Sequence, residues 1–105
     1  MKQQITLSLR RVSDQLKRKY RAQKVILFGS YAAGKASRHS DVDILIIAPT
    51  KERFFKRLAS VKRLIRDVRG GLPVSPIVYT PEEIEKRKGA GDQFILEIIE
   101  KGKEL

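Results

Sequence analysis

The chain has 105 residues, of which 41% are hydrophobic and 33% charged, with no cysteine and a formal net charge of +11. This length predicts a single domain over residues 1–105. The lack of cysteine excludes disulfides, thiolate metal sites and thiol nucleophiles. No apolar run approaches the ~18 residues of a membrane span. We therefore expect a soluble globular protein. We expect it in the cytoplasm, because its first residues lack the apolar segment of a secretion signal. Its positive charge makes nucleic acid, a nucleotide or an acidic protein possible partners.

The first third of the chain carries a helix pattern followed by a strand pattern. Apolar residues recur at spacings of three and four over residues 5–20, which predicts an amphipathic helix. Residues 24–28 form a short apolar run closed by Gly29, which predicts a buried strand that ends in a turn. A short helix is expected to follow over residues 30–35, with its N-terminus at this Gly-Ser turn.

A second strand is predicted over residues 40–49, and Pro49 ends it because proline cannot donate to a strand ladder. Side chains of a strand alternate between two faces, so Asp41 and Asp43 are expected on the same face, only two positions apart. Like charges in this arrangement repel unless a cation lies between them.

The second half of the chain predicts three further helices around a third strand. Residues 72–81 predict a strand in which Pro76 indicates an edge position or a bulge. Thr80 is suited to cap a following helix, and a last helix is expected over residues 91–102. Residues 51–69 predict the clearest helix, whose apolar stripe is expected to be core rather than partner surface and comprises Phe54, Phe55, Leu58, Val61, Ile65 and Val68.

This order of helices and strands predicts an α/β layering in which helices cover a sheet of about three strands. No repeat or linker divides the chain.

Residues 28–43, "FGSYAAGKASRHSDVD", combine two features that are weak when taken separately. A glycine turn before a helix offers backbone N–H groups to a phosphate, although Gly29 and Ser30 alone fit an ordinary turn equally well. Asp41 and Asp43 offer hard oxygen ligands of the kind that Mg²⁺ takes together with substrate phosphates, although two solvent-facing aspartates at a strand start are the simpler reading. Together they describe a phosphate site beside a metal site.

At this point the chain resembles the minimal nucleotidyltransferases of the DNA polymerase beta superfamily, whose signature is Gly-Ser, ten residues and Asp-x-Asp. The match is carried by "GSYAAGKASRHSDVD", and "VYTPEEIEK" and "ILEIIEKGKEL" resemble later parts of the family. The resemblance implies an α+β fold with a small mixed sheet, and a metal-dependent transfer of a nucleoside monophosphate, AMP from ATP, to a hydroxyl acceptor.

The resemblance also implies roles for individual residues. Gly29, Ser30 and Ser40 would bind the nucleotide, and Asp41 and Asp43 would be catalytic residues that hold Mg²⁺. Family members carry a third carboxylate on the next strand, at the position that Ser75 occupies here. Serine cannot act as a carboxylate base at neutral pH, so either another acid, such as Glu52 or one from a partner chain, completes the site, or the protein binds nucleotide without efficient turnover.

Three functions stay open on these observations. The first is a nucleotidyltransferase whose acceptor is a helical HEPN-domain protein, with this chain as the antitoxin of a toxin–antitoxin pair. A domain this small has no second lobe to seat the acceptor, so a partner or a homo-oligomer is expected. The second is an impaired, nucleotide-binding antitoxin that acts by contact alone. The third is a basic nucleic-acid-binding module, for which Tyr20 and Tyr31 would be the stacking residues.

Overall fold

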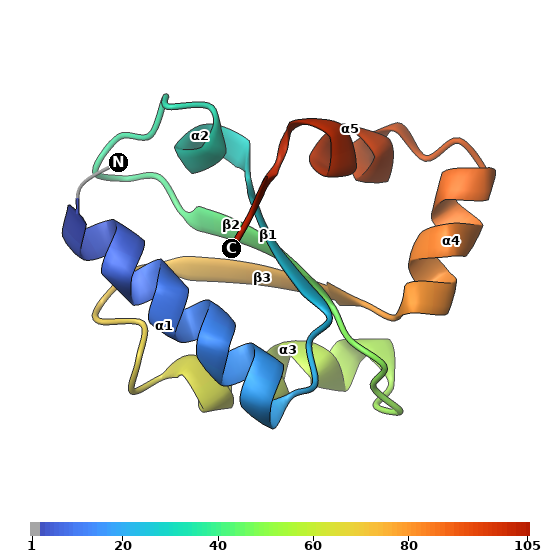
Figure 1. Cartoon of the computed structure of the whole chain (residues 1–105), viewed down its shortest axis with the longest axis horizontal. Coiled ribbons are helices and arrows are strands. Elements are labelled where there is room, and N and C mark those ends of the chain that lie inside the picture. Colours follow the sequence, from blue (N-terminus) through green and yellow to red (C-terminus); the bar gives the residue numbers. More distant parts are fainter. Residues whose placement is uncertain (1–2) are drawn as a thin grey trace.

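The computed structural model describes residues 3–105, which form five helices and four strands in a single sheet (Figure 1). The elements in chain order are α1 (Gln3–Lys19), β1 (Lys24–Phe28), α2 (Gly29–Ala32), β2 (Val42–Ile47), α3 (Phe54–Ile65), β3 (Val74–Tyr79), α4 (Pro81–Gly89), α5 (Gln93–Lys101) and β4 (Lys103–Glu104). Among these residues no helix is both long and apolar enough to cross a membrane.

The sheet is mixed and has the strand order β3-β2-β1-β4. β1 runs antiparallel to both of its neighbours, whereas β2 and β3 are parallel. The expected α+β fold with a small mixed sheet is confirmed, but the expectation of three strands is wrong by one. β4 has only two residues and pairs Lys103 and Glu104 with the centre of β1, so it carries too little pattern to be detected from the sequence.

Helices cover both faces of the sheet. α1 and α3 pack on one face and α4 and α5 on the other, as Figure 1 shows. β2 contributes to both cores because its side chains alternate: Val42, Ile44 and Ile46 face α1 and α3, whereas Leu45 and Ile47 face α4 and α5. The alternation predicted for this strand is therefore confirmed.

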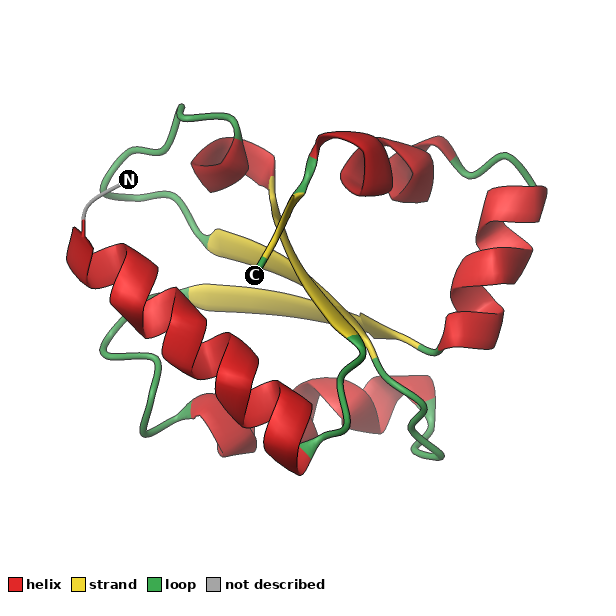
Figure 2. Cartoon of the chain, viewed as in Figure 1, coloured by secondary structure: helices red, strands yellow, loops and turns green. Residues whose placement is uncertain are grey.

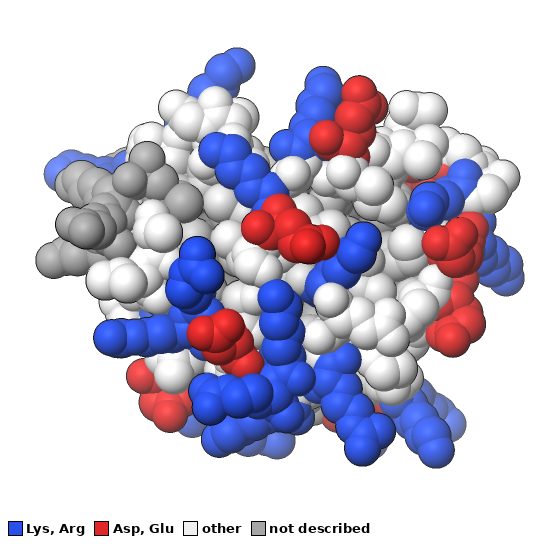
Figure 3. All heavy atoms as spheres, in the orientation of Figure 1, with Lys and Arg blue, Asp and Glu red and all other residues white. Residues whose placement is uncertain are grey.

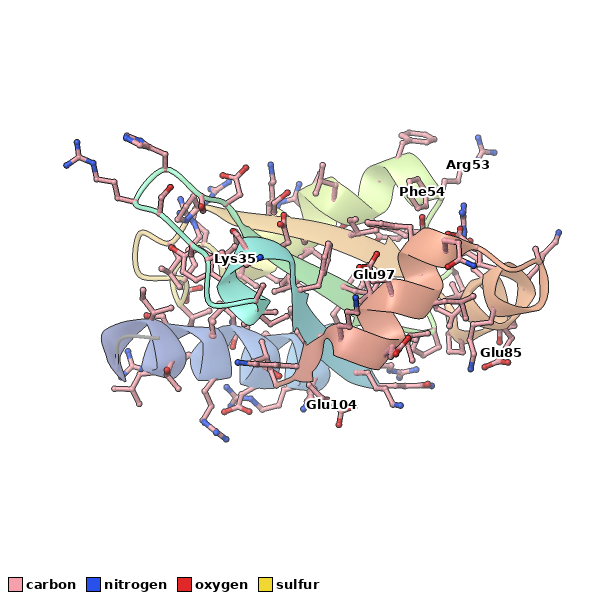
Figure 4. The ribbon with its side chains drawn as sticks, turned by 90° about the horizontal axis from the view of Figure 1, so that it is seen from above. Lys35, Arg53, Phe54, Glu85, Glu97 and Glu104 are labelled. Carbon is pink, nitrogen blue, oxygen red and sulfur yellow. The ribbon has the colours of Figure 1, made fainter. Side chains whose placement is uncertain are left out.

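The predicted helix over residues 51–69 is shorter in the structure, and its apolar stripe is divided. Val61 and Ile65 are buried against the sheet, whereas Phe54, Phe55 and Leu58 are exposed by 55%, 70% and 43%. The first turn of α3 is covered only in part: the Phe54 ring meets that of Tyr79, with ring centroids 5.6 Å apart, and the rest of the Phe54 side chain is open to solvent (Figure 4). The expectation that the whole stripe is core is wrong at these three positions.

The edge position of β3 explains Pro76. Val42 N–H donates to Pro73 and Ala48 N–H donates to Tyr79, so the odd positions of β3 turn their backbone toward β2. Pro76, at an even position, directs its nitrogen toward the open edge, where a missing N–H breaks no ladder bond.

The junction between β3 and α4 has the predicted capping box. The Thr80 hydroxyl accepts from Glu83 N–H, and the Glu83 carboxylate accepts from Thr80 N–H at 2.7 Å. Pro81 occupies the first turn of α4, where its missing N–H has no helical partner to lose. This cap fixes the direction in which the chain leaves β3 and crosses to the face that α5 also covers.

Candidate functional site

Three side chains lie in one row across the sheet. The pairing of β1 with β2 sets Phe28 opposite Asp43, and the pairing of β2 with β3 sets Ser75 beside Asp43. Paired residues of neighbouring strands share a face, and the next odd positions of β2, Leu45 and Ile47, pack under α4 and α5. The row therefore faces the α4 and α5 side of the sheet.

Gly29 begins α2 immediately after β1 and touches this row. Its φ of +75° lies in the left-handed region, and a Cβ atom at this position would collide with the Asp43 carboxylate. Glycine is thus required here for two reasons: its left-handed backbone conformation, and the short distance between its backbone and the Asp43 carboxylate. Phe28, the N-cap residue of α2, provides no side-chain cap for the first N–H groups of the turn.

The two aspartates interact, although only one of them is in the strand. Asp41 is exposed and lies one residue before Val42, where β2 begins, which corrects the expectation that the strand includes it. Asp43 is half-buried, and burial together with the Asp41 charge raises the pKa of the Asp43 carboxyl. A cation held by both groups would relieve this repulsion.

The donor set limits the kind of metal site. Within residues 3–105 there is no group of three or more histidine, aspartate or glutamate side chains, in any combination, that could hold a metal ion by itself. Mg²⁺ usually binds through one or two carboxylates, with substrate phosphates and water as its other ligands. Asp41 and Asp43 therefore fit an Mg²⁺ ion that binds together with a nucleotide.

The two serines predicted to bind nucleotide have different surroundings. Ser30 follows Gly29 in α2 and is half-buried, and its carbonyl accepts from Lys35 N–H at 2.9 Å. The Ser40 hydroxyl accepts from Ser37 N–H at 2.9 Å, so it closes a turn in the long loop between α2 and β2 (Figure 2). The structure thus brings Gly29 to the aspartates, whereas the Ser40 hydroxyl supports the loop that leads to them.

Glu52 does not complete the site. It follows the C-terminal end of β2, whereas Asp43 lies near the beginning of that strand. Its carboxylate accepts from the hydroxyls of Ser60 and Tyr20, which lower the pKa of the Glu52 carboxyl. The hypothesis that Glu52 replaces the missing third carboxylate is therefore wrong.

The tyrosines offer little for stacking on nucleic acid. Burial raises the pKa of Tyr20 to about 12, and its hydroxyl donates to Glu52 at 2.7 Å. Tyr31 packs against the core that α1 and α3 form with the sheet.

Basic side chains are spread over the visible surface and gather along its lower edge, over α1 and α3 (Figure 3).

Comparison with known proteins shows the family of this chain. A family model described as "Nucleotidyltransferase domain" matches residues 9–105. The chain belongs to this nucleotidyltransferase family. The matched range includes the Gly29 turn, both aspartates and Ser75.

Two archaeal relatives of this nucleotidyltransferase domain come from Methanocaldococcus jannaschii, and each is named "Putative protein adenylyltransferase". One is 39% identical over 66 residues, which are 57% of this chain and 43% of the relative. The other is 35% identical over 92 residues, which are 86% of each chain. The chain thus spans less than half of the first relative and most of the second.

A solved structure has the same fold. It is the crystal structure of a "putative nucleotidyltransferase" from Sulfolobus solfataricus, which is 25% identical to this chain and superimposes with a TM-score of 0.51. The similarity covers 82% of this chain and 81% of the other. The mixed sheet with helices on both faces is therefore similar to the fold of that solved structure.

Proposed function

We propose that this domain transfers a nucleoside monophosphate, AMP from ATP, to a hydroxyl group of an acceptor. The contact between the Gly29 turn and the Asp43 carboxylate carries the proposal, because it sets a backbone suited to phosphate beside a ligand suited to Mg²⁺. Membership of the nucleotidyltransferase family and the names of the two archaeal relatives support the same reaction.

In this reaction the acceptor oxygen forms a bond to the α-phosphorus of ATP. The bond from that phosphorus to the oxygen bridging to the β-phosphate breaks, and pyrophosphate leaves with the electron pair. Asp41 and Asp43 would hold Mg²⁺, which when bound would neutralise part of the phosphate charge. Ser75 stands where a carboxylate would take the acceptor proton, so the proton passes to solvent or to a group of the acceptor protein.

The acceptor is proposed to be a partner protein, a helical HEPN-domain toxin that this chain neutralises. A protein acceptor agrees with the names of both archaeal relatives. The partner, or a second copy of this chain, would also supply the proton acceptor that the site lacks. The neighbouring reading frame tests this context, since a HEPN-like helical protein encoded there is the expected finding.

Transfer itself is tested with two forms of labelled ATP. Purified protein, Mg²⁺ and the candidate partner should yield labelled partner from ATP labelled at the α-phosphate and none from ATP labelled at the γ-phosphate. Asp41→Asn and Asp43→Asn should abolish labelling. Asp14→Asn, an exposed change on α1 at the opposite face of the sheet, is the matched control and should retain it. Labelling that persists in both site variants would reject the proposal.

A second candidate is an antitoxin that binds nucleotide but acts by contact alone, and Ser75 favours it because a two-metal site lacks its third carboxylate. Neutralisation that survives Asp41→Asn and Asp43→Asn together would support this candidate over catalysis.

The net charge of +11 also supports a nucleic-acid partner. Binding that falls steeply with salt and does not depend on ATP would support that third candidate.

A further inference from the structure

A cleft of about 480 Å³ opens beside the Gly29 turn, between α2 and α5. Phe28, Gly29 and Ala32 line one side of it, and Phe94, Glu97 and Ile98 of α5 line the other. Its volume lies within the ~300–1,000 Å³ range of small-molecule sites in proteins, and its lining combines apolar surface with the charged side chains of Glu97 and Lys101. The α5 side of the cleft lies outside the motif, because α5 begins at Gln93, far along the chain from the aspartates.

The cleft is continuous with the site described above. It shares Gly29 with the phosphate turn, and Phe28 is the direct neighbour of Asp43 in the sheet. Ser75 flanks Asp43 on the opposite side. A nucleotide with its phosphates at Gly29 and Asp43 therefore has the cleft on one side, and the side toward Ser75 is left for the acceptor.

The aromatic lining suits a flat ring. Phe28 and Phe94 meet edge to face, with ring centroids 5.8 Å apart and planes at 86°. Phe94 is nevertheless 50% exposed, so about half of its surface has no partner in the fold. Bases stack on aromatic side chains in many nucleotide-binding proteins, because every base has an apolar face.

The Glu97 carboxylate gives the cleft a preference for bases that carry a hydrogen-bond donor. It lies on the side of α5 that faces α2 (Figure 4), and its carboxylate pairs with Lys101 at 3.5 Å, one helical turn away. A carboxylate accepts hydrogen bonds and cannot donate them when ionised. An exocyclic amino group, such as that of adenine, is a suitable donor to Glu97, whereas the ring carbonyls of uracil are not.

We propose that the cleft between α2 and α5 binds an amino-bearing nucleobase, such as adenine, that of the nucleotide whose phosphates lie at Gly29. This inference rests on the proposed function. Phe94 provides the stacking surface, Phe28 holds the Phe94 ring in place, and Glu97 accepts from the amino group of the base.

The test compares a ligand that has the base with one that lacks it. Calorimetry with Mg²⁺ measures the affinity of the full chain for ATP and for inorganic tripolyphosphate. Phe94→Ala should weaken ATP binding by about tenfold or more and leave tripolyphosphate binding unchanged. Phe55→Ala, which removes a more exposed phenylalanine on α3, is the matched control and should bind both ligands like the wild type.

A second variant leaves the packing of the cleft intact. Glu97→Gln keeps the size of the side chain but lets it donate, so the preference for ATP over UTP should fall relative to the wild type. Thermal unfolding of each variant checks that the fold persists.

The outcomes separate this inference from the function on which it rests. Equal affinity of the wild type for ATP and tripolyphosphate, or equal ATP affinity of the Phe94 and Phe55 variants, would overturn the cleft assignment and leave nucleotidyl transfer standing. If the wild type binds neither ligand, the proposed function fails, and the cleft assignment fails with it.

Discussion

Ser75 lies directly beside Asp43 in the parallel pairing of β2 and β3. This register shows that the serine occupies the neighbouring position on the next strand and on the same face as the carboxylate. A short side chain with a neutral hydroxyl thus lies beside Asp43, at the position where the proposed function would call for a third acid.

Ser75→Asp is expected to raise transfer activity on the order of 100-fold, because a general base typically contributes ~10²–10⁴-fold. The rate of transfer from ATP labelled at the α-phosphate measures the effect. Ser75→Asn is the control, since it has the same size without the charge. Equal rates in the Asp and Asn variants would show that position 75 is not where the proton acceptor is missing.

Gly29→Ala is expected to abolish Mg²⁺-ATP binding, because the added methyl group collides with the Asp43 carboxylate. Gly34→Ala is a close control: its φ of +71° carries similar backbone strain, but a Cβ atom there meets nothing within 4 Å. Each variant should lose about 1–2 kcal/mol of stability from the left-handed backbone, measured by urea unfolding. Normal ATP affinity in Gly29→Ala would contradict the close approach as the basis of the site.

Arg57→Met is expected to reduce the free energy of unfolding by about 2–4 kcal/mol, because it leaves buried acceptors without a donor. The Arg57 side chain is only 7% exposed and donates to the Val78 carbonyl, to the Glu52 carbonyl and to the Glu83 carboxylate at 2.7 Å. Urea unfolding measures the change. Arg63→Met, at an exposed position of the same helix, should change stability by less than about 0.5 kcal/mol.

The same ion pair predicts a pH dependence. The Arg57 guanidinium holds the pKa of Glu83 below its ordinary value of 4.5. A carboxyl with a lower pKa in the folded state stabilises the fold above the unfolded-state pKa, and this contribution disappears as the pH falls through the folded-state pKa. The stability difference between the wild type and Glu83→Gln should therefore be full near pH 6 and shrink below about pH 4.5.

Chemical unfolding from pH 6 to pH 3 measures this difference. Glu82→Gln, an exposed change in the same helical turn, controls for the loss of a charge as such. A difference between the wild type and Glu83→Gln that stays constant over the whole range would mean that the Arg57 pair does not favour the ionised form.

The elements of this fold were predictable wherever a local rule specifies them. The alternation of β2 assigned its faces, and the Thr80 to Glu83 spacing located the start of α4. Local pattern failed at the first turn of α3, because periodicity shows which residues share a helical face but not whether another element covers it. Phe54 is 55% exposed for that reason, although helical periodicity puts it on the same face as the buried Val61 and Ile65.

The sequence by itself indicated the nucleotidyltransferase family, because the resemblance is carried by one short stretch around Gly29, Asp41 and Asp43 that can be read without the fold. Only the tertiary structure decided that Glu52 lies at the wrong end of β2, that Ser75 is the direct neighbour of Asp43, and that a cleft opens between α2 and α5. Strand register and helix packing join residues that are far apart in the chain, and no spacing along the sequence encodes those contacts.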